Sequence, residues 1–126
     1  MSSEIDYATN RLIKGLVSNR KCARIGYASA LGTLVSFDGS TDDILQRVQN
    51  ALSTKTQTFI EDIKNVTTGR ILSYIALAYN QKDDLSSVLP KILPDILTMR
   101  RQAKHKLQAF IDSAIIQLSK WVYKKT

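Results

Sequence analysis

The chain has 126 residues, 44% of them hydrophobic, with a formal net charge of +7 and a pI near 9.7. This length suits one domain with its own core, and five glycines with two prolines exclude collagen-like, low-complexity and mucin-like chains. No apolar run reaches the roughly 20 residues that span a bilayer, and the first residues show no signal-peptide pattern. We therefore expect a single helical domain over residues 1–126, in a cytoplasmic protein without membrane contact.

Apolar residues at helical spacing predict helices in nearly every part of the chain. From the N-terminus we expect helices over residues 4–18, 20–35, 42–52, 54–66 and 71–79. In the second of these, Gly26 and Ala30 lie four residues apart on a face that would let another helix approach closely. Ser40 or Thr41 can cap the third helix, because a hydroxyl accepts a hydrogen bond from the free amides of the first turn.

Glycine and proline divide the second half of the chain. Gly69 separates the fourth helix from the fifth, which is apolar and which we place at the centre of the core. Residues 80–84 are polar and loop-like, and Pro90 restricts 85–93 to one short turn, because proline lacks the amide hydrogen of a helix interior. Pro94 then opens a last helix of about 30 residues, at the first position, where the missing hydrogen costs nothing.

The expected fold class is all-α, a compact bundle of about six helices with a long C-terminal helix. A minor two-stranded β element stays open as an alternative. Residues 33–37 followed by Asp38 and Gly39 look like half of a hairpin, and residues 55–60 alternate weakly between polar and apolar. No internal repeat is visible in the sequence.

The positive charge is concentrated in two clusters. Residues 1–63 carry seven basic and seven acidic side chains, whereas residues 64–126 carry eleven basic and four acidic ones. Clustered basic charge is typical of a surface that binds phosphates, and the alternative is a solvated face. The candidate nucleic-acid-binding residues are Arg20, Lys21 and Arg24 in the first cluster and Arg100, Arg101, Lys104, His105 and Lys106 in the second.

Arg100 and Lys104 conflict with the pattern of the predicted last helix. In an uninterrupted helix both fall inside the apolar sector, while Asp112 points the other way, toward solvent. Cations that face a core are expensive unless they are paired or the core has ended. Either the basic end of this helix extends beyond the core toward a partner, or a kink near Thr98 returns these residues to the surface.

The residue types favour a binding protein over an enzyme. One cysteine, Cys22, cannot form an internal disulfide, and one histidine, His105, cannot build a metal site. His105 also lies in the most basic stretch, which lowers its affinity for a proton and makes it a poorer general base. No glycine-rich phosphate loop is present. We therefore expect a non-catalytic module with no metal and no cofactor.

Two stretches of the sequence carry a resemblance to a known family. Residues 22–32 read Cys-Ala-Arg-Ile-Gly-Tyr-Ala-Ser-Ala-Leu-Gly, and after a turn residues 43–53 read Asp-Ile-Leu-Gln-Arg-Val-Gln-Asn-Ala-Leu-Ser. This pattern covers about a quarter of the chain and resembles the small subunit of archaeal type I-A CRISPR interference (Cascade) complexes.

The resemblance implies a small helical protein that packs along an antiviral effector filament. Such a protein would help to hold the guide RNA, the target DNA strand or the displaced strand without cutting it. The implied partners are nucleic acid, the other effector-complex subunits and further copies of the chain. Guide pairing would read the sequence, while lysine and arginine contact the backbone. Two other hypotheses stay open: a basic helical protein that coats DNA, as in an archaeal virus or chromatin, and a protein–protein adaptor.

Overall fold

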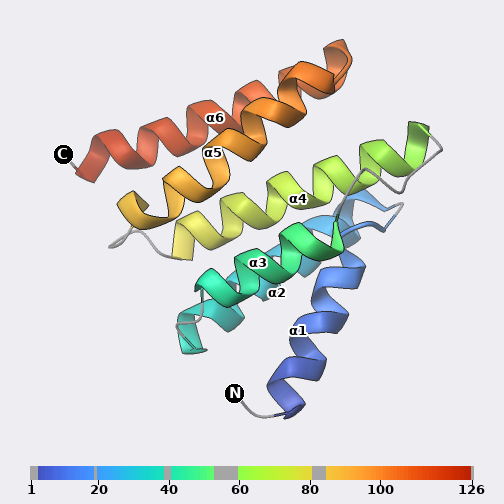
Figure 1. Cartoon of the computed structure of the whole chain (residues 1–126), viewed down its shortest axis with the longest axis vertical. Coiled ribbons are helices and arrows are strands. Elements are labelled where there is room, and N and C mark those ends of the chain that lie inside the picture. The colour runs from blue at the N-terminus through green and yellow to red at the C-terminus, as the bar shows by residue number, and fades with distance from the viewer. Residues whose placement is uncertain (1–2, 19, 39–40, 53–59, 81–84, 126) are drawn as a thin grey trace.

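Six α-helices make up the computed structural model, which describes residues 3–18, 20–38, 41–52, 60–80 and 85–125 (Figure 1). The helices are α1 (Ser3–Gly15), α2 (Lys21–Asp38), α3 (Thr41–Ala51), α4 (Ile60–Asn80), α5 (Leu85–Gln102) and α6 (His105–Lys125). The described residues contain no strand, which confirms the all-α prediction. No described helix is long and apolar enough to span a bilayer.

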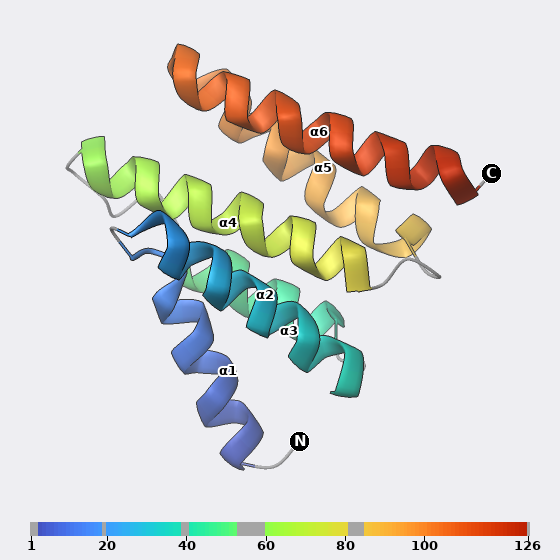
Figure 2. The ribbon, with the colours of Figure 1, turned by 180° about the vertical axis from the view of Figure 1, so that it is seen from behind.

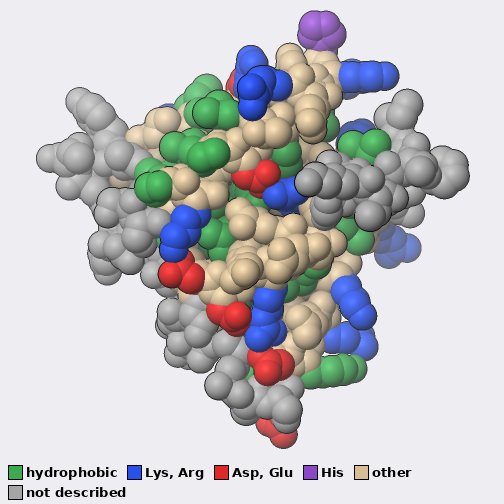
Figure 3. All heavy atoms as spheres, in the orientation of Figure 1, with side chains coloured by type: hydrophobic (Ala, Val, Ile, Leu, Met, Phe, Trp, Pro, Cys, Tyr) green, Lys and Arg blue, Asp and Glu red, His purple; other side chains and the backbone are tan. Residues whose placement is uncertain are grey.

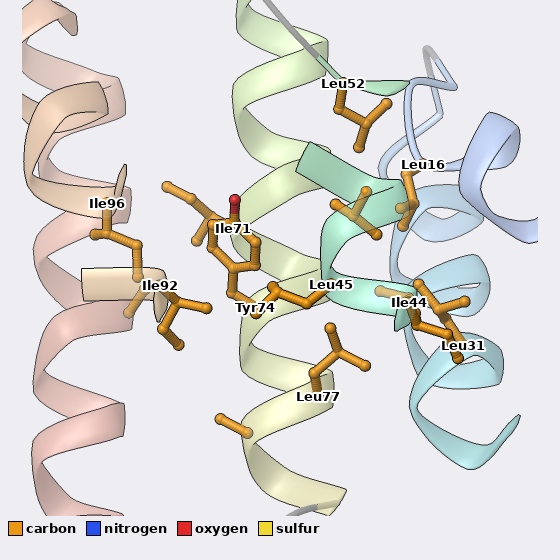
Figure 4. Close-up of a cluster of buried hydrophobic side chains, with 14 of the residues drawn as sticks. Leu16, Leu31, Ile44, Leu45, Leu52, Ile71, Tyr74, Leu77, Ile92 and Ile96 are labelled. Atoms are coloured by element: carbon orange, nitrogen blue, oxygen red, sulfur yellow. The ribbon is translucent and has the colours of Figure 1, made fainter. Parts of the chain in front are cut away.

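α4 is the central helix of the bundle. It contacts α2 and α3 on one side and α5 and α6 on the other, as the two opposite views show (Figures 1 and 2). α1 packs against α2 and α3, at the far side from α5 and α6. All six helices contribute buried apolar side chains to one core, and Figure 4 shows its central part around Ile71, Tyr74 and Leu77 of α4.

Gly69 lies inside α4, so the prediction that it separates two helices is wrong. A Cβ at this position would stand 2.3 Å from the carbonyl oxygen of Leu16, which follows α1. The glycine therefore lets two backbones approach each other more closely than any side chain would allow. Gly15 instead makes room for a side chain, because a Cβ there would lie 2.4 Å from the ring of Tyr27 in α2.

Two expectations for α2 are also wrong. A Cβ on Gly26 would meet nothing within 4 Å, and Ala30 is exposed, so this face of α2 is turned to solvent and packs against no described helix. Residues 33–37 are helical and belong to α2, so the hairpin alternative fails there. Of the second expected strand, residues 55–59 lie outside the described residues and Ile60 begins α4.

α5 runs through both of its prolines, where the sequence predicted a short turn followed by a new helix. A proline in a helix interior removes one hydrogen bond and crowds the carbonyl of the residue four positions earlier. Pro90 and Pro94 are four residues apart, so they lie on the same side of α5, and both are exposed. Pro94 has no amide hydrogen to donate to the carbonyl oxygen of Pro90. On this exposed side of α5, water can donate to that oxygen instead.

The C-terminal helix is shorter than predicted. α5 ends at Gln102, Ala103 and Lys104 are not helical, and α6 begins at His105 and runs back beside α5 (Figures 1 and 2). The expected overhang of a 30-residue helix is therefore wrong, and so is the expected kink at Thr98. The break resets the helical phase, so Arg100 and Lys104 do not share the apolar face of α6.

Ion pairs hold α1, α3 and α5 together. Arg47 of α3 pairs with Asp6 of α1 at 2.8 Å and with Asp43 in its own helix at 3.1 Å. Lys91 of α5 pairs with Asp42 at the start of α3.

The Thr41 hydroxyl is buried with no hydrogen-bond partner among the described residues, so it does not form the expected cap, and Ser40 lies outside them.

A largely buried polar cluster joins α4 and α5 to Leu52, which follows α3. The Tyr74 hydroxyl donates to the carboxylate of Asp95, which also pairs with Arg70, and Arg70 donates to the carbonyl oxygen of Leu52 at 3.1 Å. Tyr74 has no exposed surface. Its burial, together with the hydrogen bond to Asp95, raises the pKa of Tyr74 to about 12. The phenol therefore stays protonated at physiological pH and acts as a fixed donor inside the bundle.

Candidate nucleic-acid interface

The starts of α2 and α6 lie beside the same part of α4, although they are far apart in the sequence. Side chains of these three helices enclose a pocket of about 270 Å³, which we call the inter-helix pocket. Its described lining residues are Lys21, Arg24 and Ile25 of α2, Lys64, Thr68 and Leu72 of α4, and Lys106, Leu107 and Phe110 of α6. The fold thus brings members of both basic clusters together.

A second pocket, of about 470 Å³, lies at the corner between α5 and α6, and we call it the corner pocket. Its described lining residues are Ile63, Lys64, Gln102, Ala103, Lys104, His105, Lys106 and Leu107. The two pockets share Lys64, Lys106 and Leu107, so they are neighbours, and we call the two together the basic groove. No acidic residue is among its described lining residues, and Figure 3 shows the histidine at this end of the molecule with basic side chains near it.

The predicted contact residues divide into those that line the groove and those that do not. Four of them are exposed and line it: Lys21, Lys104, His105 and Lys106. Arg20 is exposed but lines neither pocket. Nothing in the sequence singles out Lys64, which stands apart from both clusters and follows Glu61 and Asp62. Only the packing of α4 between α2 and α6 reveals its place at the middle of the groove.

Arg24 is a structural residue of the groove. It is only 9% exposed, and its Nη1 donates to the carbonyl oxygen of Ser18 at 2.8 Å and to Oδ1 of Asn65 at 3.3 Å. These bonds attach the start of α2 to the preceding chain and to α4. The Nε of Arg24 is buried without a hydrogen-bond partner among the described residues, so one donor beside the inter-helix pocket is left unsatisfied.

Arg100 and Arg101 lie outside the basic groove and have protein partners. Arg100 Nε donates to Asp112 Oδ1 at 2.6 Å, and its Nη2 donates to Oδ2 at 3.3 Å, so the pair links α5 to α6. These hydrogen bonds raise the pKa of Arg100 and lower the pKa of Asp112. The expectation that Asp112 points away from Arg100 is therefore wrong. Arg101 donates to the Thr98 hydroxyl at 3.3 Å.

Two helix starts add to the positive charge of the groove. The N-terminal end of a helix carries a partial positive charge and favours acidic side chains in its first turn. α2 and α6 have no acid there, and basic residues occupy the start of each. The first backbone bond of α6 runs from Gln108 N to Lys104 O, so the amides of residues 105–107 have no partner among the described residues. Free amides at a helix start are suited to binding anions.

These features define a helical bundle with a cationic groove at one end. A family model described as DNA polymerase phi matches residues 7–118, and the chain belongs to that family. The matched region contains every described residue that lines the groove. No curated protein and no solved structure matches the chain.

The family match corrects the resemblance stated from the sequence. The chain is not assigned to the Cascade small subunits, and its predicted role in a CRISPR antiviral complex is wrong. The first of the two stretches that carried the resemblance lies in α2, where part of it faces solvent, and residues 43–51 of the second lie in the amphipathic helix α3. The match gives no support to the DNA-coating or adaptor hypotheses either. Within the described residues, no group of three or more His, Cys, Asp or Glu side chains is placed to hold a metal ion.

Proposed function

We propose that this chain is a nucleic-acid-binding module that holds the sugar–phosphate backbone in its basic groove and performs no chemistry of its own. The observation that carries the proposal is the meeting of Lys21, Lys64 and Lys106, from three different helices, beside the starts of α2 and α6. The family's description names a DNA polymerase, which supports nucleic acid as the partner.

The residues of the groove would have two kinds of role. Lys21, Lys64, Lys104 and Lys106 would contact phosphates, because a lysine ammonium is a compact charge on a long, adaptable side chain. Arg24 would position α2, since its guanidinium is already bonded inside the fold. Backbone contacts of this kind release counterions, so they give affinity that falls steeply with salt and depends little on base sequence.

The test compares two double variants that remove the same charge. Lys64→Gln/Lys106→Gln changes the groove, and Lys14→Gln/Lys120→Gln changes two exposed lysines outside it. We expect the plot of log affinity against log salt for labelled 30-mers to lose roughly one unit of slope per groove lysine, and much less in the control. Equal slopes for the two double variants would overturn the assignment of the groove.

The absence of chemistry is tested separately. Wild-type protein is incubated with a primed DNA template, the four deoxynucleotides and Mg²⁺. We expect the primer to keep its length while the protein remains bound to it. Extension of the primer, if it is lost in Lys64→Gln/Lys106→Gln and retained in the control variant, would show that the groove belongs to an enzyme and would overturn the non-catalytic part of the proposal.

A further inference from the structure

We infer that the basic groove selects single-stranded nucleic acid, and that the corner pocket receives one unpaired nucleobase. This inference rests on the proposed function and adds the class of nucleic acid to it. The groove as a whole offers positive charge, which any phosphate backbone satisfies. The corner pocket also offers an apolar interior, which a phosphate does not need.

The lining of the corner pocket combines apolar groups with a cationic rim. Ile63, Ala103 and Leu107 provide aliphatic surface, and three lysines stand around it: Lys64, Lys104 and Lys106. The volume, about 470 Å³, lies within the roughly 300–1,000 Å³ of ordinary small-molecule sites. An occupant that suits this lining has an apolar part and attached anionic groups. An unstacked nucleotide has both, whereas a duplex keeps its bases paired and stacked.

The start of α6 gives a second reason to place an anion here. Lys104 and Lys106 bring positive charge to the positive end of the helix, which costs stability in the free protein. A phosphate beside the free amides of residues 105–107 would reverse that cost. Folded proteins depart from local preferences mainly at functional sites. The start of α6 departs from the preference for acidic residues in the first turn of a helix.

The inter-helix pocket supplies a place for the neighbouring phosphate. It shares Lys64, Lys106 and Leu107 with the corner pocket, so a strand with one base in the corner continues directly over it. Arg24 also lines this second pocket. An anion at this position would meet Lys21 and Lys64, which come from two different helices.

The charge of the groove disfavours a second copy of the chain as the occupant. Each copy carries a formal net charge of +7, so a copy seated on the lysines would bring like charge to like charge. An acidic peptide with apolar side chains would match the charge, and a competition arm of the experiment below tests it.

The experiment measures the affinity of the wild-type protein for three labelled probes of 12 nucleotides. They are a mixed-sequence single strand, the same sequence as a duplex, and a single strand that keeps its phosphates but lacks its bases. A site that contacts only phosphates would favour the duplex, whose charge density is higher. We expect the ordinary single strand to bind at least about fivefold tighter than either other probe, because a base in the corner pocket adds an apolar contact.

Two variants locate the effect. Ala103→Leu reduces the space in the corner pocket without changing charge, and Ala109→Leu makes the same change at an exposed position of α6 outside both pockets. We expect Ala103→Leu to reduce the preference for the ordinary single strand at least about threefold while duplex binding is unchanged. Ala109→Leu is expected to keep the wild-type preference.

Several results would overturn the inference. Tighter binding of the duplex, or equal binding of the strands with and without bases, would leave a backbone-binding groove and remove the base site. Displacement of the strand by an equal concentration of poly-glutamate would show that charge alone, as on an acidic peptide, fills the groove. Failure of the wild-type protein to bind any of the three probes at low salt would overturn the proposed function together with this inference.

Discussion

Two pairs of helices in this bundle begin with opposite charges. α1 and α3 begin with acids, Glu4 and Asp6 in one and Asp42 and Asp43 in the other, as the helix dipole favours. Three of these carboxylates pair with a basic side chain: Asp6 and Asp43 with Arg47, and Asp42 with Lys91. α2 and α6 begin with basic residues, and in the basic groove these residues have no acidic neighbour among the described lining residues.

This difference separates two regions of the molecule. We call the region where α1 and α3 pack and form ion pairs the closed side, and the region at the starts of α2 and α6 the open side. Around α1 and α3, local electrostatics, ion pairs and close backbone packing all stabilise the same arrangement. At the starts of α2 and α6, the local electrostatics are unfavourable in the free protein and would become favourable with an anion present. The first region is therefore expected to determine stability, and the second is expected to determine binding.

The largest effect is expected from Gly69→Ala on the closed side. The new Cβ would meet the carbonyl oxygen of Leu16 at 2.3 Å, and backbone cannot move aside cheaply. We expect a loss of about 3 kcal/mol in the free energy of unfolding, measured by urea denaturation. Nucleic-acid affinity per folded molecule should be unchanged.

Gly26→Ala is the matched control for that variant. It places the same methyl group in a helix interior with no atom within 4 Å, so it should raise the free energy of unfolding by roughly 0.5–1 kcal/mol. If both variants changed stability in the same direction, close packing of Gly69 against Leu16 would not be what holds the closed side together.

The contrast between these two glycines illustrates how much of the fold can be predicted from the sequence. Apolar spacing was sufficient to predict the all-α class, because that signal is local. The roles of Gly69 and Gly26 could not be assigned, since they depend on which face meets another helix. The same applies to Pro90 and Pro94, which stand inside α5 because their rings face solvent.

The candidate site was predictable only in part, for a related reason. Charge clustering selected Lys21 and Lys106 as members of two separate clusters, and nothing in the sequence indicated that they would line the same pocket. Lys64 was missed because it joins the groove through tertiary packing alone. Arg100 was chosen for its charge. Its pairing with Asp112 could not be predicted, because that pairing depends on the turn between α5 and α6.

The next largest effect is expected at the buried polar cluster that closes α4 against α5. Tyr74→Phe removes the hydroxyl that donates to Asp95 and should lower the free energy of unfolding by about 1–2 kcal/mol at pH 7. The raised pKa of Tyr74 means that the folded protein holds this proton more tightly than the unfolded chain does. Its contribution is therefore complete below about pH 10 and is lost as the pH rises toward 12.

The pH dependence gives this second prediction its control. Denaturation is measured for wild type and Tyr74→Phe between pH 8 and 12, and the difference between them should shrink across the upper part of that range. A difference that stays constant up to pH 12 would mean that the Tyr74 phenol does not remain protonated in the folded state.

A smaller effect, of opposite sign for stability and for binding, is expected from Lys106→Glu on the open side. The glutamate restores an acid to the first turn of α6, so the free energy of unfolding should rise by roughly 0.3–1 kcal/mol at low salt. Nucleic-acid affinity should fall, because one phosphate contact is lost and a repulsive charge is added. The measurements are urea denaturation and fluorescence anisotropy on the same preparation.

Asp43→Lys is the reverse change on the closed side. It removes an acid from the first turn of α3 together with the pair to Arg47, so it should lower stability and leave binding unaffected or slightly stronger. If Lys106→Glu also destabilised the protein, the charges at the start of α6 would be serving the fold, and the contrast between the two sides would be lost.

The smallest effect is expected from the exposed pair of Arg100 and Asp112. The pKa of Asp112 is lowered in the folded state, so its contribution to stability is present above about pH 4 and is lost as the pH falls through the folded-state value. Asp112→Asn should therefore flatten the acid limb of the stability profile slightly, as followed by circular dichroism. An acid limb identical to that of wild type would mean that the pair contributes nothing measurable.

The central claim is that nucleic acid contacts the lysines of the basic groove, and lysine labelling of the wild-type protein tests it most directly. Acetylation rates at each lysine are compared by mass spectrometry, with and without a saturating single-stranded 12-mer. We predict strong protection of Lys21, Lys64, Lys104 and Lys106, with unchanged labelling of Lys14 and Lys120. Uniform protection of all lysines, or protection of Lys14 and Lys120 instead, would contradict the claim.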